Sequence, residues 1–95
     1  MYARVTTYQV DPARIAELQA KLGELKPQVK SLPGVVNTYT AWRADGQGVV
    51  MAVFASKAAA DAAAGQIQTI WGGLANLLKG APKVELFDNV EHLSG

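Results

Sequence analysis

The chain has 95 residues, the length of one domain (1–95), and a formal net charge of +1 from 9 basic and 8 acidic residues. It has no run of Lys or Arg that would neutralise a phosphate backbone, which argues against nucleic-acid binding. Cysteine is absent, so disulfides and thiolate chemistry are excluded. No stretch approaches the roughly 18 apolar residues that a membrane span needs, and we expect a cytoplasmic protein.

The low charge content of the chain predicts a large buried interface. Charged residues make up 18% of the sequence and hydrophobic residues 49%, whereas a typical globular domain carries about 25% charged residues. A domain of this size buries only a modest share of its surface when alone. We therefore expect a homodimer.

The first half of the chain predicts a strand, a helix and a second strand. Residues 1–10 alternate as a strand does, and Asp11-Pro12 is a typical helix start. An apolar stripe at steps of three and four follows, made of Ile15, Leu18, Leu22, Leu25 and Val29. Pro27 should kink this helix or mark its last turns, and Leu32-Pro33-Gly34 should end it.

The second half predicts a hairpin, a helix and a last strand. Strands over 35–44 and 49–55 flank the turn residues 45–48. Ser56 is placed to cap an Ala-rich helix, which Gly72-Gly73 should break or loosen. The last strand is expected over 84–90, followed by a polar tail.

This order predicts an α+β, ferredoxin-like βαββαβ fold, in which an antiparallel four-stranded sheet carries two helices on one face. The strand over 49–55 is apolar on both faces, because Met51 and Val53 alternate with Ala52 and Phe54. A strand with one solvated face would alternate apolar and polar residues. Since the helices cover one side only, a second copy of the chain is the simplest cover for the other.

Four short segments then suggest a family. They are the opening strand Ala3-Arg4-Val5-Thr6-Thr7, the Asp11-Pro12 helix start, Leu32-Pro33-Gly34-Val35, and Val53-Phe54-Ala55-Ser56-Lys57. In their order and spacing the chain resembles the antibiotic biosynthesis monooxygenase-like family of the dimeric α/β-barrel superfamily. The resemblance implies two sheets paired face to face. It also implies oxidation of a small phenol, quinol or anthrone by molecular oxygen without flavin, haem or metal.

One branch of that family degrades haem with an Asn on the first strand and a Trp and an iron-ligating His around the second helix. Here Thr6 and Thr7 stand on the first strand, and the second helix has Trp71 but no His. The haem activity is therefore disfavoured.

The candidate catalytic residues are Asn37, Tyr39, Arg43 and Trp71. The first three share one face of the second strand and offer an amide, a phenol and a cation that suit a phenolate. The alternative is an edge strand with a solvated polar face. Trp71 would wall a pocket, or else simply fill the core. We expect the four to border a cavity between helices and sheet, or within the barrel.

Other polar and aromatic residues are expected to be structural. Arg4 and Tyr8 share a face of a central strand, where Arg4 would need a partner such as Glu85. Trp42, opposite the polar trio, is expected to pack in the core or at a dimer interface, and the only histidine, His92, is expected to be solvated. No metal-ligand set and no phosphate-binding loop can be assembled, so no cofactor is expected.

Two functions from different classes remain open. The first is a cofactor-independent monooxygenase acting on a small aromatic substrate. The second is a non-catalytic module of the same fold that binds a small molecule or only dimerises.

Overall fold

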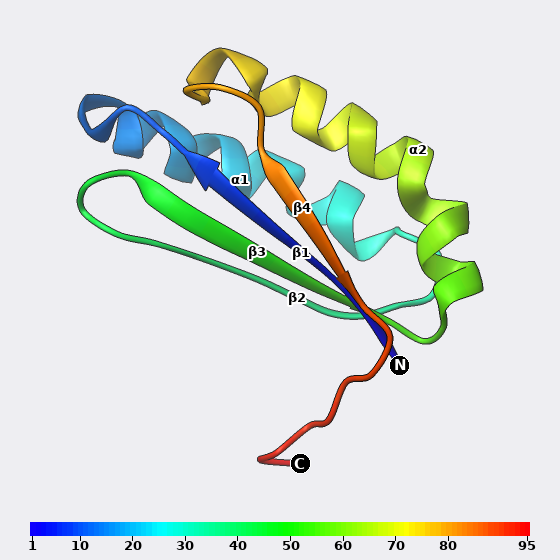
Figure 1. Cartoon of the computed structure of the whole chain (residues 1–95). Helices are drawn as coiled ribbons and strands as arrows, with labels where there is room; N and C mark the ends of the chain where they lie inside the picture. The colour runs from blue at the N-terminus through cyan, green and yellow to red at the C-terminus, as the bar shows by residue number, and fades with distance from the viewer.

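The computed structural model describes residues 1–95. Its elements are β1 (Tyr2–Gln9), η1 (Pro12–Arg14), α1 (Ile15–Lys30), β2 (Val35–Trp42), β3 (Gln47–Phe54), α2 (Lys57–Leu74), η2 (Ala75–Leu77) and β4 (Lys83–Phe87). The strands form one antiparallel sheet in the order β2-β3-β1-β4. Both long helices lie on the same side of that sheet (Figure 1). This is the predicted ferredoxin-like βαββαβ arrangement. No helix combines the length and the apolar character that a bilayer crossing requires.

Both helix starts are capped as the sequence predicts. Asp11 Oδ1 accepts a hydrogen bond from the Ala13 amide at 3.0 Å, in the 3-10 turn that leads into α1. Ser56 Oγ accepts one from the Ala59 amide at 3.1 Å at the start of α2. Each cap satisfies an amide that the helix itself leaves without a partner, and this fixes where the chain turns from strand to helix.

The ends of α2 and of the last strand differ slightly from the expected positions. α2 continues through Gly72-Gly73 to Leu74 and then passes into the 3-10 turn η2, so the expected loosening comes just after the glycine pair. Each glycine costs about 1 kcal/mol in a helix interior, and the burial of Ile67 before the pair and Leu74 after it offsets that cost. The last strand ends at Phe87 and does not reach Val90, so the exposed tail begins earlier than expected.

The strand register decides which side chains face the helices. Arg4 lies between Ala52 of β3 and Leu86 of β4, and Ala52 in turn lies beside Thr38 of β2. Even-numbered residues of β1 and of the paired strands therefore form the helix-facing surface. A bulge between Val35 and Asn37 shifts the register at the start of β2.

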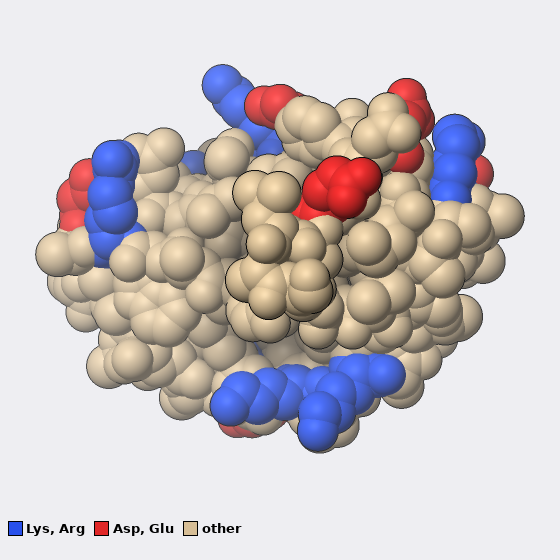
Figure 2. All heavy atoms as spheres, turned by 90° about the horizontal axis from the view of Figure 1, so that it is seen from below, with Lys and Arg blue, Asp and Glu red and all other residues tan.

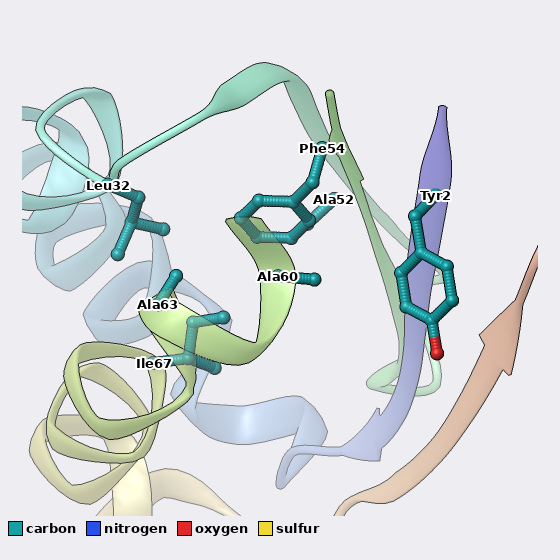
Figure 3. Packing of buried hydrophobic residues seen from close by; sticks show 7 residues of the cluster. All are labelled: Tyr2, Leu32, Ala52, Phe54, Ala60, Ala63 and Ile67. Carbon is teal, nitrogen blue, oxygen red and sulfur yellow. The ribbon is translucent and has the colours of Figure 1, made fainter. Parts of the chain in front are cut away.

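The core lies between this sheet surface and the helices, in two clusters. Near the start of β1, Phe54 is fully buried and points from β3 toward Ala60 and Ala63 of α2, beside Leu32 (Figure 3). The small alanines let α2 approach the sheet closely. The second cluster lies at the other end of β1 and comprises Tyr8, Val10, Leu18, Leu25, Leu74 and Leu77.

The sheet face opposite the helices carries exposed apolar side chains, beside Lys83 and Glu85 of β4. Val49 of β3 is 36% exposed, Met51 39% and Phe87 of β4 44%. Figure 2 views this side of the molecule and shows uncharged residues over most of it, with charged side chains mainly toward its edge. The expectation that β3 is apolar on both faces is confirmed.

Candidate functional site

A cleft of about 560 Å³ lies between the helices and the helix-facing surface of the sheet. Its volume is within the range of about 300–1,000 Å³ that small-molecule sites occupy. Strands β1, β2 and β3 contribute to it, together with both long helices. Its lining comprises Arg4, Thr6, Leu22, Leu25, Lys26, Val29, Lys30, Leu32, Val35, Val36, Asn37, Thr38, Thr40, Val50, Ala52, Ile67, Ile70, Trp71 and Leu74.

At one end, an aromatic pair and a cross-strand hydrogen bond order the cleft. The Tyr8 hydroxyl lies 2.8 Å from Thr40 Oγ1, and Thr40 also donates to the Val49 carbonyl at 3.0 Å. The Tyr8 ring lies against Trp71, with ring centroids 5.7 Å apart and an interplanar angle of 59°. This tilted contact is a favourable aromatic geometry. The Trp71 ring is therefore held in place by a residue that is itself anchored to β2.

At the other end, two buried polar atoms have no hydrogen-bond partner in the protein. They are Nε of Arg4 and Oγ1 of Thr38, and both residues line the cleft. The expected pairing of Arg4 with Glu85 was wrong. Glu85 pairs with Val5 in the β1–β4 register, so it lies on the opposite face of the sheet from Arg4.

The charges that line the cleft are all positive. Arg4 from β1 and Lys26 and Lys30 from α1 are its only charged residues, and no Asp or Glu lines it. The two lysines are exposed and lie four residues apart on one side of α1, so they stand at the mouth. Such a cleft attracts an anion and disfavours a cation.

The structure separates the four predicted catalytic residues. Trp71 lines the cleft and Asn37 lies at its edge, beside the bulge. Tyr39 is 69% exposed and pairs with Met51 on the face opposite the helices. Arg43 is exposed beyond the end of β2. There its Nη2 forms an ion pair with Asp45 Oδ2 at 3.4 Å and donates a hydrogen bond to Gln47 Oε1. Alternation along β2 thus directs Tyr39 and Arg43 away from the cleft.

Sequence reasoning missed the threonines and lysines of the cleft. Thr38 and Thr40 share a strand face with Trp42, which was expected only to pack, and Trp42 does pack against the core beside Tyr8. Their hydroxyls face the helices because Asn37 and Tyr39 face the other way. The four-residue spacing of Lys26 and Lys30 beside the apolar stripe was the one available signal for a cationic mouth.

No group of three or more His, Cys, Asp and Glu side chains comes together anywhere in residues 1–95. His92 lies in the exposed tail, far from the cleft lining. The cleft lining holds neither histidine nor carboxylate, so its residues offer no ligand set for a metal ion.

No sequence profile of a known protein family matches the chain, and no curated protein shows significant similarity to it. Solved structures do. A protein from Caulobacter crescentus CB15, assigned as an antibiotic biosynthesis monooxygenase, is 26% identical with a TM-score of 0.79, over 95% of this chain and 90% of that one. The chain resembles the antibiotic biosynthesis monooxygenases.

Two further solved structures show that the resemblance extends to proteins of different assigned function. SnoaB, a cofactor-independent oxygenase from Streptomyces nogalater, has a TM-score of 0.76 at 20% identity, over 99% of this chain and 97% of that one. A protein of unknown function from Nitrosomonas europaea has a TM-score of 0.80 at 18% identity, over 96% and 90%. At these identities the likeness is one of fold. The predicted resemblance to antibiotic biosynthesis monooxygenases is confirmed, and the substrate remains to be argued from the cleft.

Proposed function

We propose that this protein is a cofactor-independent monooxygenase that binds a small aromatic phenol, quinol or anthrone in the cleft between helices and sheet. The observation that carries the proposal is the cleft itself. Its walls are mostly apolar, it includes Trp71, and its only charges are positive. An electron-rich aromatic that loses a proton becomes an anion with an apolar body, which matches such a lining.

The proposed chemistry needs no reductant, because the substrate supplies the electrons. In an anthrone, two C–H bonds of the ring methylene break and a carbonyl forms with one atom of molecular oxygen. The other oxygen atom leaves as water with the two hydrogens. The carbon loses four electrons and dioxygen gains four. The protein would contribute a dry site in which nearby positive charge favours the substrate anion.

Of the four predicted catalytic residues, we retain Trp71 as the one that contacts the substrate in this site. Trp71 would stack on the aromatic body, and its position is fixed by the contact with Tyr8. Asn37 borders the edge of the cleft at the bulge, but it shares the strand face of Tyr39, which points away from the helices, so we propose no contact between its amide and the substrate. We propose that Tyr39 acts elsewhere, in the subunit interface described below.

One observation favours the second candidate function, a non-catalytic binding module. The cleft lining holds no histidine, carboxylate or tyrosine that would take a proton from the substrate. Turnover would then depend on a substrate acidic enough to ionise on binding. A protein that binds aromatics without consuming oxygen would fit the same cleft.

We also propose that a second copy of the chain covers the sheet face opposite the helices. That face carries Val49, Met51 and Tyr39, all exposed, together with Phe87 at its β4 side. Exposed apolar surface of this kind marks an interaction site in a stable protein. A symmetric dimer would bury the same residues from both subunits.

Oxygen consumption tests the proposed activity. Anthrones and hydroquinones would be incubated with the protein under labelled dioxygen, and uptake would be followed with an electrode above the spontaneous rate. The proposal predicts uptake and one labelled oxygen atom per product, found by mass spectrometry. Trp71→Phe should lower the rate by about tenfold or more because it shortens the wall that positions the ring.

Trp42→Phe is the matched control, because Trp42 also packs against the Tyr8 cluster but does not line the cleft. It should leave the rate unchanged. Tight binding of these aromatics with no uptake above the spontaneous rate would contradict the oxygenase and support the binding module.

A further inference from the structure

The two polar atoms without partners in the cleft point to the chemistry of its ligand. Nε of Arg4 and Oγ1 of Thr38 are both buried and without a hydrogen bond from the protein. A buried N–H of a cationic side chain is unfavourable when no acceptor pairs with it. The cleft lining contains no Asp or Glu that would do so.

The strand register brings these two groups to the same level of the cleft. Arg4 pairs with Ala52, and Ala52 pairs with Thr38, so the three residues form one row across β1, β3 and β2. The Arg4 and Thr38 backbones are therefore two strand spacings apart, about 10 Å. The methyl group of Ala52 between them leaves room above the sheet for a small acidic group. An arginine binds a carboxylate through two parallel hydrogen bonds, and a threonine hydroxyl can donate a third.

The rest of the cleft suits an aromatic body attached to that acidic group. Tyr8 lies four residues along β1 from Arg4, which is about 13 Å in a strand, and it holds Trp71 at that end. The distance is comparable with the length of two or three fused rings. Apolar residues from both helices, among them Leu25 and Ile67, line the space between the two ends.

We infer that the ligand of this cleft is an aromatic carboxylate, whose carboxylate group binds Arg4 and Thr38 while its rings extend toward Trp71. The inference rests on the proposed function for the location of the site, and it adds the substrate class. Lys26 and Lys30 at the mouth attract the anion without selecting its orientation. Arg4 is a binding residue in this account and takes no proton.

The test compares 3-hydroxy-2-naphthoic acid with its methyl ester, which has the same rings but no charge and one added methyl group, by calorimetric titration at pH 7. We expect the acid to bind the wild-type protein at least about tenfold more tightly than the ester, as hydrogen bonds between charged groups allow. Arg4→Gln should remove this preference while leaving the affinity for the ester unchanged. Thr38→Val, a change of similar volume, should reduce the preference in part.

Two further variants distinguish the proposed pairing of the carboxylate with Arg4 from general electrostatic attraction by the lysines, and from a loss of folding. Lys26→Gln combined with Lys30→Gln should weaken the salt dependence of acid binding but keep the preference for acid over ester. Arg4→Lys, which retains the charge but loses the bidentate geometry, should show an intermediate preference and serves if Arg4→Gln does not fold.

The outcomes distinguish this inference from the proposed function. Equal affinities of the wild-type protein for acid and ester would overturn the inference alone, since the cleft would still bind an aromatic. A preference that survives Arg4→Gln would also overturn it. If neither ligand binds, the cleft is not a binding site, and the proposed function fails together with the inference.

Discussion

The Tyr8 hydroxyl reaches Thr40 Oγ1 at 2.8 Å although a whole strand, β3, lies between the two residues. The ring crosses β3 at Gly48, where a Cβ atom would lie 2.3 Å from Cζ of Tyr8. The bond therefore ties β1 to β2 over a position that only glycine fits, and it supports the ring that holds Trp71. The aromatic end of the cleft depends on this crossing.

Gly48→Ala should destabilise the protein. The added methyl group would displace the Tyr8 ring and break its bond to Thr40, at a cost of about 1–3 kcal/mol by analogy with overpacked cores. Urea unfolding followed by circular dichroism measures the change. Gly65→Ala is the matched control, because a Cβ at Gly65 in α2 meets nothing within 4 Å. It should stabilise the protein by about 0.5–1 kcal/mol. Equal stability of Gly48→Ala and the wild type would contradict the close packing of the Tyr8 ring over Gly48.

Tyr8→Phe isolates the hydrogen bond from the ring. Thr40 keeps its bond to the Val49 carbonyl in this variant, so we expect a loss of only about 0.5–1.5 kcal/mol in the free energy of unfolding. Tyr2→Phe is the control on the same face of β1, since the Tyr2 hydroxyl has no hydrogen bond to the protein in this structure. It should change stability by less than about 0.5 kcal/mol. A larger loss for Tyr2→Phe than for Tyr8→Phe would be inconsistent with this account.

Met51→Glu tests the proposed subunit interface. The chain mass is 10.1 kDa, and sedimentation equilibrium of the wild-type protein at micromolar concentration should give about twice that value. A carboxylate at the centre of the buried face should shift the protein to monomer, because it would be desolvated without a partner. Gln68→Glu adds the same charge on the exposed side of α2 and should leave the dimer intact. A wild-type monomer under these conditions would refute the interface.

The fold could be predicted because its signals are local. Asp11 and Ser56 cap the helices that follow them, and the turn at Gly46, with φ of 88°, separates two strands of the expected pattern. Alternation along β2 likewise indicated that Asn37 and Tyr39 share a face. Each of these depends on residues only a few positions apart.

The site could not be predicted to the same extent, because it depends on which face the helices cover. With β3 apolar on both sides, nothing local tells the face of Thr38 from the face of Tyr39. The missing partner of Arg4 is a matter of three-dimensional packing, since the register alone places Glu85 on the other side of the sheet. Tyr39 and Arg43 therefore lie away from the cleft, although the sequence grouped them with Asn37.

The central claim is that the ligand binds between the helices and the sheet, and methyl NMR tests it most directly. Ile67 and Ile70 line the cleft, whereas Met51 and Val49 lie on the opposite face of the same sheet. Titration with 3-hydroxy-2-naphthoic acid should shift the methyl signals of the two isoleucines and leave those of Met51 and Val49 unchanged. Shifts at Met51 and Val49 with unchanged isoleucines would place the ligand on the other face and contradict the account.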